Sequence, residues 1–244
     1  MLDAGSSLLG AWVSLASDGR VTIEGMNAMG YDAMGVGLME GLEGLDVLLD
    51  RRDEAGFPIL SANLTYVEGG ALVLEPYAIL ERDGVRYGFL GLTGPEFTQG
   101  PGLAAVVAVG DPTEAAARYV PELRARVDVL IVLSTLGKGE DNALAAAVPG
   151  IDVIVGSKSA YLMQEPDRAG DTVIVQQGYL GEWLGRTHLR YDAEGALAEA
   201  STEAIALTED YPDDPDLAAL VSRYNALHPT PAPVPLTPSP TSKP

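Results

Sequence analysis

The sequence predicts a layered α/β domain. Two apolar runs, Val129–Leu133 and Ile151–Val155, are each followed by a small polar loop, and an alanine-rich segment of good helix formers lies between them. A strand, loop, helix, strand and second loop in this order are typical of a sheet whose sites lie at the carboxyl ends of its strands. Apolar runs also alternate with helical patterns earlier in the chain, and the later segments are typical of antiparallel strands. Together these observations favour sheets covered by helices.

The composition narrows the functions to consider. A chain of 244 residues, 47% hydrophobic and 20% charged, suits one larger globular domain or a domain with a tail. Its formal net charge of −20 disfavours nucleic acids and anionic membranes as partners. No run approaches the roughly 18 apolar residues of a membrane span. The chain has no cysteine, which rules out disulfides and thiol chemistry, and its start MLDAGSSLLG does not resemble a signal peptide.

The first half of the chain is expected to alternate strands and helices. Buried strands are predicted at Met1–Gly5, Tyr31–Gly37 and Phe57–Ala62. A helix should begin after Asp18-Gly19 and end at Gly30. A second helix has Gly56 as its C′ residue, and its apolar face is formed by Leu42, Leu45, Leu48 and Leu49.

Turn and capping signals define the second half. The Asp83-Gly84 pair predicts the two-residue turn of a hairpin, and Asp111 is expected to cap a helix. From Pro229 onward, the proline-rich sequence predicts an extended, disordered tail. The other predicted elements are strands at Ala78–Arg82, Val85–Leu92, Ala104–Val109, Thr172–Gln177, Gly185–Asp192 and Leu197–Leu207, and a helix at Asp213–Leu227 capped by Asp214.

Two loops of the central stretch resemble those of an enzyme family. After the first apolar run the chain has Ser134-Thr135-Leu136-Gly137, and after the second it has Gly156-Ser157-Lys158-Ser159-Ala160. The calcineurin-like metallophosphoesterases, in their 5'-nucleotidase branch, have Ser-His-Leu-Gly and Gly-Gly-His-Ser-His at these places. The loops are similar to the family's, but the three metal-binding histidines are replaced by Thr135, Lys158 and Ala160.

The resemblance extends over almost all of residues 1–227. The start of the chain resembles the family's Leu-Asp-Ala-Gly-Asp-Ser, with Ser6 in place of the metal-bridging aspartate. The family's Gly-Asn-His-Glu corresponds to Gly37-Leu38-Met39-Glu40 in this chain. Leu38 therefore replaces an asparagine ligand, and Met39 replaces the catalytic histidine. The segments that match the family well are Met26–Met34, Phe57–Asn63 and Leu90–Thr93.

The resemblance implies a layered αββα sandwich with two mixed sheets. The residue pattern alone supports a plain three-layer α/β fold about as well. The family's first strand, with its Asp-x-His motif, and the helix after it have no counterpart, because the chain starts after them. We therefore expect a metallophosphoesterase-like domain over residues 1–227, N-terminally truncated relative to the family. A proline-rich disordered tail over residues 228–244 stands in place of the family's C-terminal nucleotide-binding domain.

The substitutions remove the chemistry that the family uses. The resemblance implies a centre of two divalent metal ions, and such a centre needs carboxylate, imidazole and amide ligands. Serine, leucine, methionine and alanine cannot replace these ligands for hard divalent ions. The Lys158 ammonium would put a positive charge where a cation should lie. Neither His188 nor His228 falls in a matching loop. The sequence therefore predicts no catalytic residue, no metal and no other cofactor.

Four polar residues remain as candidates for ligand binding. Ser6, Asn63, Thr135 and Lys158 should converge at one end of the sheets. There Lys158 could bind a phosphate or carboxylate directly, with the hydroxyl groups as further donors. The plainer alternative is that Lys158 points to solvent or pairs with Glu40. Glu40 itself is expected to support the fold rather than to act as a base.

Three interpretations of function are open. The first is a catalytically inactive 5'-nucleotidase-like domain that serves as a binding or scaffolding module, for a nucleotide or another small anion. The second is a fragment or divergent member of a metal-dependent phosphoric monoester hydrolase, completed by a missing segment. The third is a decayed gene product without a selected function. The truncation would leave an open sheet edge, which a protein partner or a second copy of the chain should cover. The compartment is unknown: the resemblance implies export, but no signal peptide is recognisable.

Overall fold

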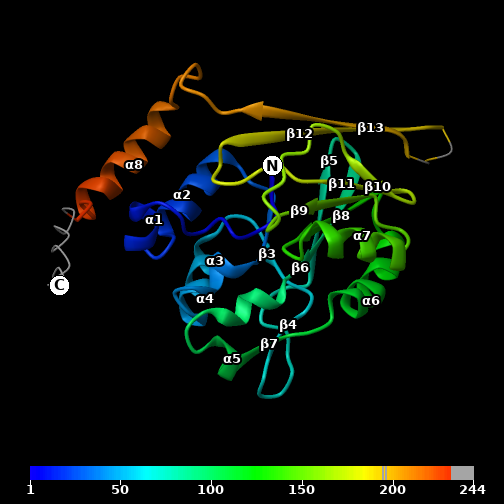
Figure 1. Cartoon of the computed structure of the whole chain (residues 1–244), viewed down its shortest axis with the longest axis horizontal. Helices are drawn as coiled ribbons and strands as arrows, with labels where there is room; N and C mark the ends of the chain where they lie inside the picture. Colours follow the sequence, from blue (N-terminus) through cyan, green and yellow to red (C-terminus); the bar gives the residue numbers. More distant parts are fainter. Residues whose placement is uncertain (194, 196, 232–244) are drawn as a thin grey trace, which may run out of the picture.

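The centre of the protein is a six-stranded mixed sheet (Figure 1). The computed structural model describes residues 1–193, 195 and 197–231. In spatial order the strands of this sheet are β10 (Asp167–Ala169), β11 (Thr172–Val175), β9 (Val153–Gly156), β8 (Val129–Ser134), β6 (Val85–Leu92) and β5 (Tyr77–Arg82). The four middle strands are parallel, and β10 and β5 pair antiparallel at the two edges.

Strand β8 lies in the middle of the sheet because both of its faces are apolar. All six of its residues are buried. Leu130 and Val132 pack against α6 (Pro112–Arg124) and α7 (Lys138–Ala147), whereas Ile131 faces the second sheet. A strand that is covered on both sides requires apolar side chains at every position. The strand predicted over 129–133 is thus confirmed.

The second sheet is short and entirely parallel. Ala33 and Leu60 face the six-stranded sheet, whereas Met34 and Ile59 face helices. The strands, in spatial order, are β1 (Leu2–Asp3), β2 (Ala33–Gly35) and β3 (Ile59–Leu60).

Helices cover the outer faces of both sheets and give the molecule four layers. The small sheet packs against α2 (Arg20–Met29) and α4 (Leu45–Glu54), and the large sheet packs against α6 and α7. Figure 1 shows α6 and α7 on the right of the molecule, and α1 (Trp12–Ala16), α2 and α4 on the left. The αββα sandwich is therefore confirmed, with the difference that only the larger sheet is mixed.

The remaining elements lie around these layers. The antiparallel hairpin of β12 (Trp183–Tyr191) and β13 (Leu197–Ala206) packs against the apolar cluster between the two sheets. Helix α8 (Pro215–Leu227) packs on α1 and α2. Within the described ranges, none of the helices has the length and apolar character that crossing a membrane requires. The short elements are α3 (Leu38–Gly41), β4 (Leu64–Tyr66), η1 (Pro95–Gln99), α5 (Leu103–Val106) and β7 (Val107–Val109).

Local geometry explains why the turn and capping predictions are confirmed. Asp83 and Gly84 have φ angles of 53° and 78°, the left-handed conformation that two-residue hairpin turns require. The Asp111 carboxylate accepts hydrogen bonds from the backbone N–H groups of Thr113 and Glu114 at the start of α6. The cap predicted for α8 forms in the same way.

The strand predicted at Ala104–Val109 is wrong in its first half. Gly102, in a left-handed conformation, starts the short helix α5, and the chain becomes extended only at β7. Ala104 and Ala105 are good helix formers. A short apolar run does not distinguish a strand from a buried helix, which is why the pattern misled.

Two further predictions concern ends of elements. Gly56 follows α4 as predicted, but its φ angle is not left-handed, and its N–H donates to Asn27 Oδ1 at 2.6 Å. Of the tail expected from Pro229, residues 232–244 lie outside the described part of the chain.

Candidate functional site

The loops that follow three strands meet at one end of the two sheets. Ser6 follows β1, Gly37 follows β2, and Thr135 follows β8. A methyl group built on Gly37 would lie 2.1 Å from Ser6 Oγ and 2.8 Å from Thr135 Cγ2. Only a residue without a Cβ atom fits between these two side chains. The structure thus brings Ser6 and Thr135, two of the four predicted site residues, together around Gly37.

Glu40 joins the first two of these loops. Its carboxylate is 1% exposed and accepts hydrogen bonds of 2.7–3.0 Å from the backbone N–H groups of Gly37, Ser6, Ser7 and Leu8. Burial raises the pKa of the Glu40 carboxyl above its usual value, and these hydrogen bonds offset only part of the rise. Glu40 therefore supports the fold, as expected.

Thr135 connects three loops through its hydroxyl group. The hydroxyl donates to the Val36 carbonyl oxygen and accepts from the Gly94 N–H, both at 2.9 Å. The residue is 3% exposed. A ligand that accepts a hydrogen bond from Thr135 would have to replace the bond to Val36, so the residue holds the site together rather than presenting a free donor.

Asn63 has the same structural role. It donates its two amide hydrogens to the carbonyl oxygens of Thr93 and Gly110, at 2.8 and 3.0 Å. Its Oδ1 accepts from the Thr93 N–H at 2.8 Å. Both donors of the side chain are thus used to tie the loop after β3 to the loops after β6 and β7.

Lys158 and Ser6 keep capacity for a ligand. Lys158 Nζ lies 2.6 Å from Glu96 Oε1 and donates to the Leu136 carbonyl oxygen at 3.1 Å. The pairing of Lys158 with Glu40, one of the alternatives considered, is thus wrong, because Lys158 pairs with Glu96 in η1 instead. Hydrogen bonding to Lys158 lowers the pKa of Glu96. The Lys158 side chain is 38% exposed, and the Ser6 hydroxyl forms no hydrogen bond with any residue that the structure describes.

Three residues of the site have a left-handed backbone. The φ angles of Ser6, Lys158 and Ala160 are 65°, 68° and 53°. For residues with a Cβ atom this conformation costs about 1–2 kcal/mol. All three are positions that the resemblance assigns to metal ligands. The loops therefore keep a strained shape although the side chains at these positions have changed.

The residues present do not fit a pair of divalent ions. The Met39 side chain packs against the apolar cluster of α2 and α4, and Leu38 offers no ligand atom. Lys158 adds a positive charge. Across residues 1–193, 195 and 197–231, no group of three or more histidine, aspartate or glutamate side chains is placed to hold a metal ion. A two-metal centre needs such a group of hard ligands.

A buried carboxyl lies behind the site, and the sequence-based candidates did not include it. Asp141, in the first turn of α7, is 1% exposed and accepts a hydrogen bond from the Ser134 hydroxyl. A methyl group built on Gly156 would lie 2.6 Å from Asp141 Oδ2, which has no hydrogen-bond partner among the described residues. Burial raises the pKa of Asp141 to about 7, although the hydrogen bond from Ser134 lowers it. Acidic residues in a first helical turn are usually exposed, so no local signal marked this one.

Comparison with known proteins first defines the class. No model of a protein family matches the chain. The fold is shared with the crystal structure of the calcineurin-like phosphoesterase YfkN from Bacillus subtilis, with a TM-score of 0.75 and 22% identity over 93% of this chain and 83% of that one. The four layers are therefore those of the metallophosphoesterase-like fold.

Closer similarity identifies the branch. A 5'-nucleotidase of Bos taurus is 30% identical, over 92% of this chain and 43% of that protein. The 5'-nucleotidase precursor from Thermus thermophilus is also 30% identical, with a TM-score of 0.82 over 93% of this chain and 49% of that one. A snake venom 5'-nucleotidase of Naja atra is 29% identical, over 91% of this chain and 47% of that protein. These similarities support a metallophosphoesterase domain of the 5'-nucleotidase branch, and the chain spans less than half the length of each of these three relatives.

The left-handed backbone at Ala160 predicts a stabilising substitution. In Ala160→Gly the steric cost of the positive φ angle disappears, so the free energy of unfolding should rise by roughly 0.5–1 kcal/mol. Ala117→Gly, at an exposed position of α6, should instead lower it by about 1 kcal/mol. Urea unfolding measures both. A loss of stability in Ala160→Gly similar to that in Ala117→Gly would show that the loop is not strained.

The buried Asp141 predicts a pH dependence. Its pKa is about 7 in the folded protein, against 3.8 for a free carboxyl. The folded protein therefore binds one more proton than the unfolded chain between these values, and the free energy of unfolding falls as the pH rises through this window. The whole pKa difference between the folded and unfolded states corresponds to at most about 4 kcal/mol of folding stability.

Asp141→Asn keeps the shape of the neutral acid and removes the titration. Between about pH 5.5 and pH 8, wild type should lose on the order of 1–3 kcal/mol of stability relative to this variant. Asp171→Asn, at an exposed position, should follow wild type. The free energy of unfolding of both proteins is measured by chemical denaturation at each pH. If it changes with pH by the same amount in wild type and in Asp141→Asn, the prediction is refuted.

Proposed function

We propose that this domain is a catalytically inactive member of its family that binds a small anion, such as the phosphate of a nucleotide, at Lys158. One observation carries the proposal: a partly exposed ammonium group lies at a position that the resemblance assigns to a metal-binding histidine. A lysine can bind a phosphate or carboxylate oxygen directly through a charge-assisted hydrogen bond. The proposal includes no metal, no other cofactor and no catalytic residue.

Glu96 acts in this proposal as an internal competitor for the anion site. Its carboxylate is 2.6 Å from Lys158 Nζ, and the two side chains are 32% and 38% exposed. Ion pairs at this level of exposure contribute about 0–1 kcal/mol. A doubly charged phosphate can therefore displace Glu96 at little cost. Removing the Glu96 charge should strengthen anion binding rather than weaken it.

Titration with inorganic phosphate and with AMP tests the proposal. Glu96→Gln should bind the anion about three- to fivefold more tightly than wild type, because it lacks the competing charge. Lys158→Ala should show no binding. Lys138→Ala, which removes the neighbouring lysine that pairs with Asp167, is the matched control and should bind within about twofold of wild type.

Calorimetry and backbone NMR shifts measure the dissociation constants. Two results would end the proposal: no binding to wild type and Glu96→Gln, or equal binding by Lys158→Ala. Binding of AMP but not of phosphate would leave the anion site in place and would narrow its ligand to nucleotides.

The rival interpretation, a hydrolase completed by a missing segment, has a structural weakness. A further segment could add ligands of its own, but it cannot change the side chains at Ser6, Leu38 and Lys158. It also cannot remove Met39 from the apolar cluster against which it packs. We therefore favour the binding module.

We also propose that the domain acts as a scaffold and that a second copy of the chain covers its open sheet edge. Among the described strands, β1 pairs only with β2, and the β12–β13 hairpin pairs with no other strand. Leu2 and Leu189 pack against the same apolar cluster, so β1 and the hairpin lie on the same side of the large sheet. Unpaired strand edges readily accept a further strand.

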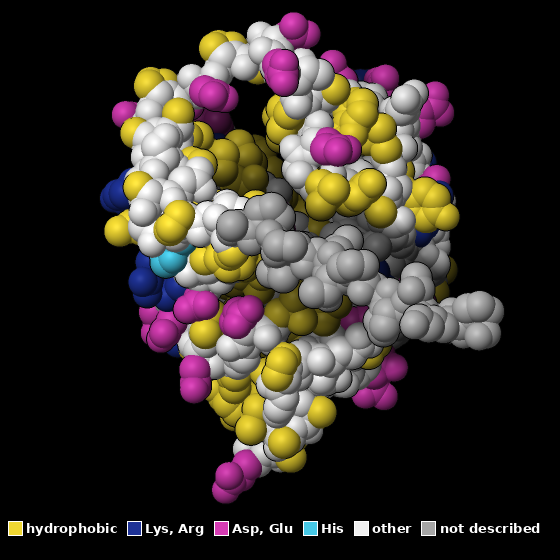
Figure 2. All heavy atoms as spheres, turned by 60° about the vertical axis from the view of Figure 1, so that its left-hand side comes forward, with side chains coloured by type: hydrophobic (Ala, Val, Ile, Leu, Met, Phe, Trp, Pro, Cys, Tyr) yellow, Lys and Arg dark blue, Asp and Glu magenta, His cyan; other side chains and the backbone are white. Residues whose placement is uncertain are grey.

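The side of the molecule that carries α1 and α8 is a second surface that favours contact with another copy of the chain. Figure 2 shows hydrophobic side chains gathered there, with acidic side chains around them. Large apolar side chains on α1 and α8 are 39–66% exposed, namely those of Trp12, Leu15, Val221 and Leu227. Exposed apolar patches of this kind are typical of protein–protein contacts.

Light scattering coupled to gel filtration tests this scaffold proposal. The chain should form a dimer whose fraction rises with concentration. The double variant Val221→Ser, Leu227→Ser should weaken the dimer by about tenfold or more, because it removes two apolar side chains that the dimer contact would bury. Leu180→Ser, at another highly exposed leucine, should have no effect. A monomer at every concentration would contradict the proposal.

A further inference from the structure

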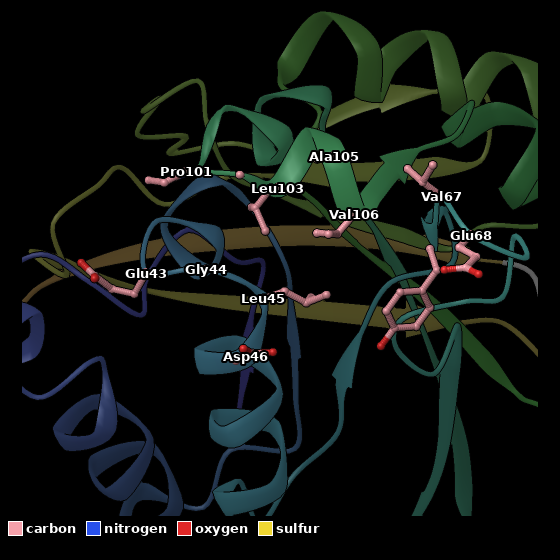
Figure 3. Close-up of a pocket in the computed structure, with 12 residues that line it drawn as sticks. Glu43, Gly44, Leu45, Asp46, Val67, Glu68, Pro101, Leu103, Ala105 and Val106 are labelled. Atoms are coloured by element: carbon pink, nitrogen blue, oxygen red, sulfur yellow. The ribbon is translucent and has the colours of Figure 1, made fainter.

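One cavity of the structure lies outside the residues of the proposed anion site. It has a volume of about 610 Å³, which is in the range of ligand-binding pockets, and it is open to solvent. Its walls are the start of α4, the helix α5 with the loop before it, and the end of β4 (Figure 3). None of Ser6, Asn63, Thr135 and Lys158 lines it.

The interior of this cavity is apolar. Leu103 is 1% exposed and belongs to the core below the cavity. Figure 3 shows Leu45, Leu103 and Val106 pointing toward one another. Val67 and Val106 are 56% and 46% exposed, and the Val67 N–H donates to the Val106 carbonyl oxygen at 2.9 Å. This hydrogen bond holds the two valines side by side, and they form one wall of the cavity that is exposed to solvent.

Carboxylates surround the apolar interior. Figure 3 shows Glu43, Asp46 and Glu68 spaced around the cavity. None of the three takes part in a hydrogen bond or ion pair through its side chain in the described part of the chain. Among the residues that the structure describes, no lysine, arginine or histidine lines the cavity. The cavity therefore repels anions, and its electrostatic complement is a cation.

We propose that this cavity docks a short segment of a partner protein in which a basic side chain stands next to a large apolar one. The apolar side chain would cover Leu45, Val67 and Val106, which removes their exposed apolar surface from water. The neighbouring arginine or lysine would be attracted to the carboxylates around the cavity and would pair with the one that it reaches, and the planar guanidinium of arginine suits a carboxylate best. An open, shallow cavity accepts side chains that project from a backbone better than it encloses a whole small molecule.

Methyl NMR with a defined probe tests the inference. The probe is the capped peptide Gly-Leu-Arg-Leu-Arg-Leu-Gly, and the reporters are the methyl groups of Leu45, Val67, Leu103 and Val106. These methyl signals should shift on titration and give a dissociation constant. Peptides with glutamate in place of arginine, or alanine in place of leucine, should bind at least about tenfold more weakly.

Two triple variants with the same change in net charge separate docking in the cavity from non-specific attraction of the basic peptide to the acidic protein. Glu43→Gln, Asp46→Asn, Glu68→Gln should weaken binding at least about tenfold, whereas Asp171→Asn, Glu209→Gln, Asp213→Asn should stay within about twofold of wild type. Circular dichroism checks that both variants fold. Equal weakening by the two triples, equal binding of the alanine peptide, or methyl shifts confined to other residues would each overturn the inference.

Discussion

The four hydrogen bonds that Glu40 accepts are the constraint on which the site depends. A buried carboxylate is stable only when its oxygens have donors, because burial without partners is costly. Here the donors are backbone N–H groups from the loop after β1 and from Gly37 after β2. The carboxylate therefore fixes both strand exits relative to each other, and it places Ser6 next to Gly37 and Thr135. The loops after β6 and β3 then attach through the hydroxyl of Thr135 and the amide of Asn63.

These contacts explain how a family scaffold can persist without the family's metal ligands. The loop conformations are held by backbone hydrogen bonds and close packing, and neither needs a metal ion. The left-handed φ angles at Ser6, Lys158 and Ala160 are consistent with this, because the resemblance assigns these positions to metal ligands in the family. Metal chemistry, in contrast, depends on the side chains themselves. Replacing those side chains removes the ligands and leaves the loop framework intact.

The sequence predicted most of the fold because its signals are local. Residues next to one another in the chain determine the geometry of each correctly predicted feature. Examples are the apolar run of β8, the Asp83-Gly84 turn and the Asp111 cap. The strand predicted at Ala104–Val109 is half wrong because a short apolar run is ambiguous. The layer order, in contrast, followed from the resemblance, since local pattern favours three layers as much as four.

The candidate site was less predictable because its contacts join distant parts of the chain. Lys158 pairs with Glu96 rather than Glu40, and nothing in either loop's sequence indicates that contact. Asn63 looks like a free amide in the sequence but uses both of its donors within the fold. The burial of Asp141 depends on Gly156 from the next strand, so its shifted pKa could not be inferred from its position in a helix.

Metal content after loading tests the central claim most directly, namely that this scaffold has lost the means to hold two ions. The full chain is incubated with excess manganese, zinc or iron, passed through a desalting column, and analysed by mass spectrometry for bound metal. The account predicts less than about a tenth of an equivalent per chain, because the described part of the chain places no group of three or more histidine, aspartate or glutamate side chains to bind the ions. Retention of about two equivalents, with chelator-sensitive hydrolysis of a chromogenic phosphate ester, would contradict it.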